Sequence, residues 1–157
     1  MANEFKFRAL TNEDWKDIED KDLTAEGGLR LKKDKGDGCY ISKSLDSGKE
    51  GCRWHRIVLD ADVPENSTIT VFFYSSDKEE AAKSWYGTLV FKKVNDDFKN
   101  PKDALVQTPP GRYISLKIDF HSEGRESPVL RQVKIYYPRL SYLRYLPAVY
   151  QEESASK

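Results

Sequence analysis

The sequence predicts an antiparallel β-sandwich, an all-β fold with at most short helical turns. Several segments alternate apolar and polar residues with a period of two, and turn-forming residues separate these segments. Almost no stretch has the pattern of a packed helix. Short strands joined by turns are typical of two antiparallel sheets that bury one face of each strand between them.

Composition limits the class of protein. The 157 residues fit one domain with a single sizeable core. The 26 basic and 26 acidic side chains cancel, so no overall field favours nucleic acid or an anionic membrane as a partner. No stretch approaches the roughly 20 apolar residues of a membrane helix, and the start of the chain lacks the apolar core of a secretory signal. We therefore expect a protein that is cytoplasmic when made and does not insert into a membrane.

The N-terminal part carries weaker signals. Residues 5–8 alternate in polarity and predict a short first strand. Thr11 and Asp14 have the spacing of a capping box, which predicts a helical turn over residues 12–19. A glycine pair at 27–28 marks a turn before another short strand.

The middle of the chain predicts three strands. Residues 55–62 and 68–73 alternate clearly, and residues 85–92 indicate a further strand. Residues 76–84 have helical composition but are too short for a packed helix, so we expect a loop there, and 95–110 is a proline-rich connection. The apolar faces of the first two strands consist of His55, Ile57, Leu59, Ala61, Ile69, Val71 and Phe73.

The strongest alternation lies near the C-terminus, in residues 112–120 and 129–137. A charged loop centred on a glycine joins them, so the sequence predicts two neighbouring antiparallel strands. One face of the first strand carries Ile114, Leu116, Ile118 and Phe120. One face of the second is expected to carry Val129, Arg131, Val133, Ile135 and Tyr137.

Three stretches are more specific than their strand pattern. They are CRWHRIVLDADVPENSTITVFFYSSD (52–77), GRYISLKIDFHSEGRESPVLRQVKIYYPR (111–139) and SYLRYLPAVYQEE (141–153). In this order they resemble the phage tail-type proteins of contractile injection systems, whose members sit in the baseplate of phage-like particles. The middle stretch also looks like β-sandwich modules of galactose-binding or jelly-roll type.

The resemblance implies a structural, non-enzymatic protein that docks onto other tail or baseplate subunits and becomes part of a phage-like particle. It divides the chain into a β-sandwich over 1–138 and a segment, 139–157, that starts a truncated further tail-protein domain or forms a docking tail. Apolar and aromatic side chains crowd this segment, as they do at protein interfaces. The residues expected to dock are Tyr142, Leu143, Tyr145, Leu146, Pro147 and Tyr150.

A carbohydrate-binding module is the alternative. Exposed aromatic rings on a sandwich can stack against a glycan, and the candidates are Tyr40, Trp54, Trp85 and Tyr86. Large aromatic side chains more often pack in a core, which is the competing interpretation for Trp54 and Trp85.

The chemistry of an enzyme or a metal site has little support, and we expect no cofactor. Cys39, Cys52 and His55 lack a fourth ligand at a zinc-finger spacing, and both cysteines are expected to be reduced. His121 has no nucleophile motif around it. Asp60 and Asp62 share a strand face, which describes a solvated edge more simply than a weak calcium site.

Overall fold

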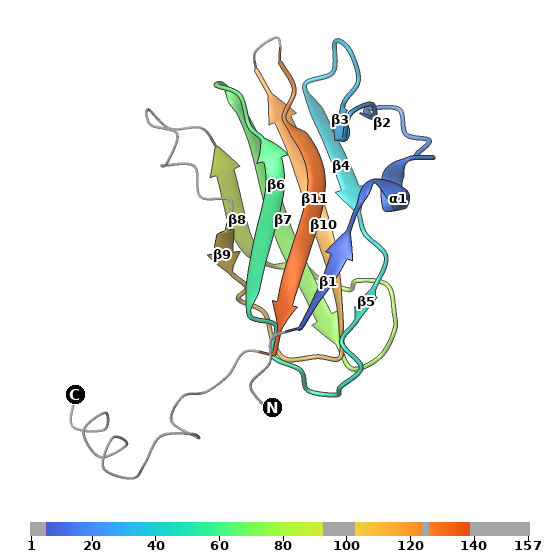
Figure 1. The fold of residues 1–157 in the computed structure, drawn as a ribbon, viewed down its shortest axis with the longest axis vertical. Coiled ribbons are helices and arrows are strands. Elements are labelled where there is room, and N and C mark those ends of the chain that lie inside the picture. Colours follow the sequence, from blue (N-terminus) through green and yellow to red (C-terminus); the bar gives the residue numbers. More distant parts are fainter. Residues whose placement is uncertain (1–5, 93–102, 124–125, 139–157) are drawn as a thin grey trace, which may run out of the picture.

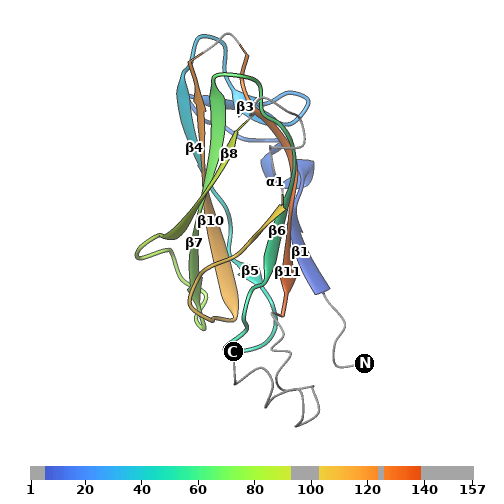
Figure 2. The ribbon, with the colours of Figure 1, turned by 90° about the vertical axis from the view of Figure 1, so that its left-hand side faces the viewer.

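Two antiparallel sheets packed face to face form the protein, so the predicted all-β sandwich is confirmed (Figures 1 and 2). The computed structural model describes residues 6–92, 103–123 and 126–138. We name the sheets by their central long strands, the β11 sheet and the β10 sheet. The jelly-roll or galactose-binding-like subtype stays a prediction.

The β11 sheet has the order β2-β3-β11-β6-β9, and β1 also pairs with β11. Its strands are β1 (Lys6–Leu10), β2 (Leu23–Ala25), β3 (Leu29–Leu31), β6 (Arg56–Asp62), β9 (Asp103–Leu105) and β11 (Val129–Tyr137). The β10 sheet has the order β4-β10-β7-β8, and β5 also pairs with β10. Its strands are β4 (Asp37–Ile41), β5 (Leu45–Asp46), β7 (Ser67–Ser76), β8 (Tyr86–Lys92) and β10 (Tyr113–Ser122).

The core lies between the sheets and is built by the predicted alternation. The inward side chains of β6, β7 and β10 are at most 3% exposed, and each of them larger than alanine contributes roughly 1.5–3 kcal/mol relative to an exposed one. They are Ile57, Leu59, Ala61, Ile69, Val71, Phe73, Ile114, Leu116, Ile118 and Phe120. The period of two therefore correctly identified the buried face of these three strands.

The predicted helical turn is present as α1 (Asn12–Trp15), shorter than the 12–19 expected. Its capping box is formed: the backbone N–H of Thr11 donates to Oδ2 of Asp14 at 2.8 Å, and the Thr11 hydroxyl accepts from the N–H of Glu13 at 3.3 Å. The turn places the indole of Trp15 in the core, edge-on to the ring of Tyr40 with 5.9 Å between centroids. One helical turn thus covers part of the open edge of the sandwich beside β1 and β4 (Figure 1).

One prediction about strand pairing is wrong. β10 and β11 are not neighbours but lie in opposite sheets, β10 beside β4 and β7, and β11 beside β1, β3 and β6. Two apolar strand faces can be buried by stacking across the core just as well as by lying side by side, and the residues between β10 and β11 are too many for a tight turn. The connection crosses from one sheet to the other.

A β-bulge in β11 corrects a second prediction. The register against β6 shifts between Leu130 and Gln132, which leaves Arg131 as the extra residue. Leu130 is consequently fully buried, whereas Arg131 is exposed and Val129 is only half-buried. A regular strand would have turned the guanidinium of Arg131 into the core, so the bulge removes that conflict.

Residues 77–85 form a loop, as expected, whereas the connection predicted over 95–110 contains the short strand β9. The first and last strands pair, with Lys6 opposite Tyr137, so the chain enters and leaves the sandwich at the same end (Figure 1). Among the described residues, no helix is long and apolar enough to cross a membrane.

Candidate interaction surfaces

The six residues predicted to dock, together with the proposed second segment 139–157, lie outside the described residues. Any interaction site on the described part must therefore come from the faces, edges or loops of the sandwich. Four places stand out: the outer face of each sheet, the end at which the chain enters and leaves, and the loops at the opposite end.

The outer face of the β11 sheet carries a row of three apolar or aromatic side chains and one arginine. Phe7, Tyr136, Arg56 and Leu105 are successive register partners across β1, β11, β6 and β9, so their side chains project from one line on the face. Phe7 and Leu105 are each 45% exposed. The rings of Phe7 and Tyr136 are 5.5 Å apart between centroids. We call these four residues the Phe7 row.

Positive charge accompanies this row. Nζ of Lys134 lies 5.1 Å from the centroid of the Phe7 ring, and the guanidinium of Arg56 belongs to the row itself. A shallow hollow of about 290 Å³ lies against it, lined by His55, Arg56, Val58 and Tyr136. The face therefore combines exposed apolar area with cations.

The outer face of the β10 sheet is different, because its own chain covers the aromatic rings. Nζ of Lys117 lies 5.1 Å from the centroid of Phe72, and the hydroxyl of Tyr74 donates to a carboxylate oxygen of Glu80 from the 77–85 loop. Toward the other end of the strands, Nδ1 of His121 lies 2.7 Å from Oδ1 of Asp37.

The cysteines are both free. Cys39 is exposed on β4, where desolvation and a hydrogen bond with Asp119 raise the pKa of its thiol to about 11. Cys52 is buried before β6, and burial likewise raises the pKa of its thiol. Among the described residues, no three His, Cys, Asp or Glu side chains are grouped so that they could hold a metal ion.

The aromatic residues predicted to stack on a glycan do not form one platform. Trp54 is 2% exposed, its indole N–H donates to the carbonyl of Gly111 at 2.9 Å, and it packs on Tyr137, so it belongs to the core as the competing interpretation expected. Tyr40 and Tyr86 lie on β4 and β8, the opposite edge strands of the β10 sheet. Trp85 precedes Tyr86 and is half-buried.

An ion pair braces the end of the sandwich at which the chain enters and leaves. Nε and Nη2 of Arg112 donate to the two carboxylate oxygens of Asp46 at 2.7 and 2.9 Å. The hydrogen bonds from Arg112 lower the pKa of Asp46 to about 2. Asp60 and Asp62 on β6, the candidate calcium ligands, form ion pairs with Arg131, the extra residue of the bulge in β11. These carboxylates are explained by ion pairs within the fold.

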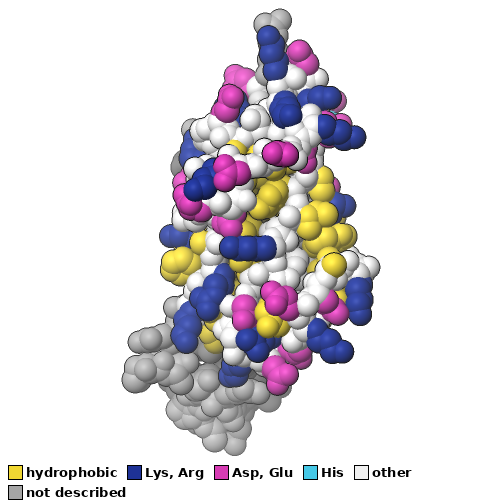
Figure 3. Space-filling view, turned by 90° about the vertical axis from the view of Figure 1, so that its right-hand side faces the viewer, with side chains coloured by type: hydrophobic (Ala, Val, Ile, Leu, Met, Phe, Trp, Pro, Cys, Tyr) yellow, Lys and Arg dark blue, Asp and Glu magenta, His cyan; other side chains and the backbone are white. Residues whose placement is uncertain are grey.

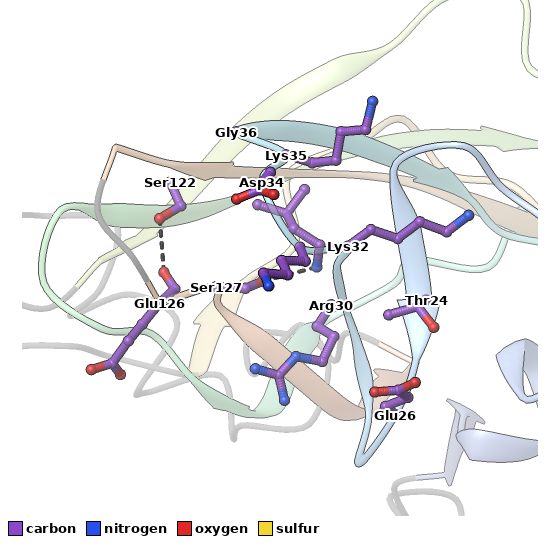
Figure 4. A pocket seen from close by; sticks show the side chains of 12 residues that line it. Thr24, Glu26, Arg30, Lys32, Asp34, Lys35, Gly36, Ser122, Glu126 and Ser127 are labelled. Atoms are coloured by element: carbon purple, nitrogen blue, oxygen red, sulfur yellow. Dashed lines mark hydrogen bonds between the residues drawn. The ribbon is translucent and has the colours of Figure 1, made fainter.

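A polar hollow lies among the loops at the opposite end of the molecule. Its volume is about 790 Å³, and its walls come from the β2–β3 hairpin, the β3–β4 loop and the β10–β11 connection (Figure 4). Charged and hydroxyl-bearing side chains dominate the lining. The lining residues are Thr24, Glu26, Arg30, Leu31, Lys32, Lys33, Asp34, Lys35, Gly36, Ser122, Glu126 and Ser127.

Comparison with known proteins supports the fold and nothing finer. No protein-family model matches the chain, and no curated protein matches it. Among solved structures, the chain is similar to one from the Glycosylation Associate Protein (Gap123) complex of Streptococcus agalactiae, with 10% identity and a TM-score of 0.50. The match covers 86% of this chain but 26% of that chain, so this protein spans about a quarter of its length. At this identity the likeness concerns the sandwich alone.

Sequence reasoning missed both the Phe7 row and the polar hollow. The row depends on the pairing of β1 with β11, whose residues are far apart in the chain, and the hollow joins loops from both halves of the molecule. The alternation around Phe7 was visible in the sequence, but its partner on the sheet was not.

Proposed function

We propose that this protein is a non-enzymatic docking module of a phage tail-like contractile particle. The resemblance of the three sequence stretches supports the particle, and the Phe7 row supports docking. The observation that carries the proposal is the 45% exposure of both Phe7 and Leu105 on one sheet face, since apolar side chains aligned in this way favour contact with another protein.

The position of the row strengthens the proposal. Tyr136 belongs to the row, and β11 ends at the next residue, Tyr137. The row therefore lies at the end of the sandwich at which the described chain stops, at Pro138. The predicted docking residues follow later in the sequence, and we expect a subunit that docks on the row to contact them as well.

The partner is expected to be another tail or baseplate subunit with an apolar patch bordered by carboxylates. Lys134 and Arg56 stand beside the apolar atoms of the row, so carboxylates on the neighbour would complement them and fix its orientation. In this proposal nucleic acid is not a partner, because basic and acidic side chains are equally numerous. Figure 3 shows the two signs of charge interspersed along one edge of the sandwich.

The test is sedimentation of a tagged chain expressed in the source organism. The wild-type protein should sediment with fast particles that show a contractile tail in electron micrographs. The double variant Phe7→Ala/Leu105→Ala should remain in the supernatant. Val90→Ala, which truncates an exposed apolar residue on the β10 sheet, is the matched control and should sediment like wild type.

Two results would contradict the proposal. Wild-type protein that stays in the supernatant would show that the protein is not part of such a particle. Equal sedimentation of wild type and the double variant would show that docking does not use the Phe7 row.

A further inference from the structure

The strand β1 forms an open edge of the β11 sheet. Among the described residues it pairs with β11 alone, and Figure 1 shows it as the outermost arrow beside β11. An edge strand presents backbone N–H and C=O groups that no neighbouring strand has taken. Phe7 lies on this strand, so the Phe7 row stops where the backbone of β1 is open.

The hydrogen bonds of β11 show which way its backbone groups point. The carbonyl of Tyr136 accepts from the N–H of His55 at 2.9 Å, and His55 immediately precedes β6. The backbone groups of Tyr136 therefore face β6. Successive residues of a strand direct their backbone groups to opposite sides, so those of Ile135 and Tyr137 face β1.

The register then assigns the backbone groups of β1. Lys6 and Arg8 lie opposite the β11 residues that face β1, so these two residues bond to β11. Phe7 and Ala9 alternate with them and direct their N–H and C=O groups to the open side. Side chains approach closely in pairs that exchange no hydrogen bond, and the 5.5 Å between the ring centroids of Phe7 and Tyr136 agrees with this assignment.

Arg8 braces this edge without closing it. Its Nε donates to the carbonyl of Asp46 on β5 at 2.8 Å, and its Nη1 donates to the carbonyl of Phe7 at 3.2 Å. The N–H of Phe7 and both backbone groups of Ala9 have no hydrogen-bond partner among the described residues. These groups stand at alternate positions of β1, as an added strand requires.

The side chains around this edge are basic. The residues of β1 and the β11 residues opposite them include Lys6, Arg8 and Lys134 but no acidic residue. Nζ of Lys134 lies 5.1 Å from the centroid of the Phe7 ring, so charge and apolar surface are adjacent. Figure 3, which faces this side of the sandwich, shows basic side chains next to apolar surface. Ala9 lies opposite Lys134, and its methyl group leaves room for a longer side chain on an added strand.

We propose that β1 receives an extended segment of the docking partner, which adds a strand to the β11 sheet. The inference deepens the proposed function and rests on docking through the Phe7 row, because it names the form of the partner there. On the added strand, an apolar side chain opposite Phe7 continues the row, and a carboxylate opposite Ala9 pairs with Lys134. Main-chain hydrogen bonds supply affinity, and these two side chains supply specificity.

The other strand edges lack this combination. At the far end of the Phe7 row, β9 has only three residues. Ile41 on β4 and Tyr86 and Val90 on β8 are exposed, but they are not register partners of one another. The edge of β8 is also irregular, because its register against β7 shifts near Gly87, which has a φ of 66°.

The test is amide hydrogen exchange of the whole chain, followed by NMR, with the acetylated and amidated heptapeptide TETVTET as the probe. Its central valine and flanking glutamates suit β1 in either strand direction. In the free protein the amides of Arg8 and Leu10 should exchange slowly, and those of Phe7 and Ala9 quickly. With a Kd of about 1 mM, peptide at about 10 mM should slow exchange at Phe7 and Ala9 about tenfold.

Two control peptides separate strand addition from simple attraction. TETPTET keeps the charges, but its proline removes the central N–H donor, and TKTVTKT reverses the charges. Each should slow exchange at Phe7 and Ala9 by less than about twofold. These comparisons use the wild-type protein, so they do not depend on the folding of any variant.

A matched pair of variants tests the edge itself. Ala9→Pro removes an outward N–H donor but no bond between β1 and β11, which an edge strand tolerates, and it should raise the Kd at least about tenfold. Slow exchange at Leu10 verifies that β1 of this variant still pairs. Ala81→Pro, in the exposed 77–85 loop, is the control and should bind as wild type does.

Three results would overturn the inference. Slow exchange at Phe7 and Ala9 in the free chain would show that another part of the chain or a second copy already occupies the edge. Unchanged exchange with TETVTET, or equal slowing by TETPTET, would show that no strand is added.

Sedimentation separates this inference from the proposed function. Ala9→Pro should stay in the supernatant, as the Phe7→Ala/Leu105→Ala variant should. If Ala9→Pro enters particles like wild type, docking stands and strand addition fails. If wild-type protein stays outside particles while TETVTET protects β1, the particle fails and strand addition stands.

Discussion

The two sheets bury equivalent inner faces but treat their outer aromatic residues differently. On the β10 sheet, Lys117 covers Phe72 and Glu80 holds Tyr74, so two separate segments of the chain protect the rings. On the β11 sheet, Phe7 remains 45% exposed although Lys134 lies over its ring. The β10 sheet also has exposed apolar side chains, Ile41, Tyr86 and Val90, but they lie on its two edge strands and are not register partners of one another. The two faces therefore differ in how their apolar side chains are aligned.

The inner faces should respond alike, and the largest effect is expected there. Leu116→Ala in the β10 sheet and Ile135→Ala in the β11 sheet should each lower the free energy of unfolding by about 2–5 kcal/mol, because both side chains are fully buried and truncation leaves a cavity. Urea denaturation measures the loss. Ile41→Ala, at a site 59% exposed, is the control and should change stability by less than about 0.5 kcal/mol. A small loss at either core site would show that its sheet does not share the core.

The cysteine on the outer face of the β10 sheet should react slowly with alkylating reagents. With the pKa of Cys39 raised to about 11 from 9.0, its reactive thiolate at pH 8 should be about 100-fold scarcer than that of an ordinary cysteine. Alkylation by iodoacetamide, followed by peptide mass spectrometry, should therefore label Cys39 slowly in the folded protein and quickly in urea. Rapid labelling of the folded protein would show that Asp119 and the partial burial do not protect the thiol.

The ion pair at the chain-entry end should make stability depend on acid. The pKa of Asp46 is lowered to about 2 from 3.8, so its pairing with Arg112 stabilises the folded state above pH 4. This contribution is lost as the pH falls from about 4 to about 2. The thermal midpoint of wild type should drop over that interval by more than that of Asp46→Asn. Parallel curves for the two proteins would mean that the pair contributes nothing.

The smallest expected effect compares the two lysines that lie over rings. Lys117→Gln and Lys134→Gln should each cost about 0.5–1 kcal/mol, the value of a cation–π contact near the surface. Chemical denaturation of both variants side by side would measure it. A much larger loss for Lys134→Gln would indicate that Lys134 is structural and that the Phe7 row is less available to a partner than we propose.

Local pattern was enough to predict the class of this fold and the buried faces of its long strands. The period of two identified the buried faces of β6, β7 and β10, and the spacing of Thr11 and Asp14 identified α1. Both signals depend on neighbouring residues, whose geometry is fixed by the backbone itself. The same kind of reasoning also rejected a packed helix at 76–84, and the structure has a loop over 77–85.

Long-range pairing was beyond the same reasoning. Alternation shows that a strand has one apolar face but not which strand lies beside it, so β10 and β11 were assigned to one sheet. The sequence did offer a hint of the bulge in β11. Arg131 is a charged residue on an otherwise apolar strand face, and the bulge turns it outward. The Phe7 row and the polar hollow were not predicted for the same reason, because each joins residues that are far apart in the sequence.

The pairing of Lys6 with Tyr137 has a mechanical consequence. Because β1 and β11 are antiparallel and this is the first pair of their ladder, tension applied between Lys6 and Tyr137 would break the hydrogen bonds of β1 one after another. Such unzipping needs less force than shearing all of them together. Under such a load the sandwich would open at β1 first, while the pairing of β11 with β6 and of β10 with β7 stayed intact.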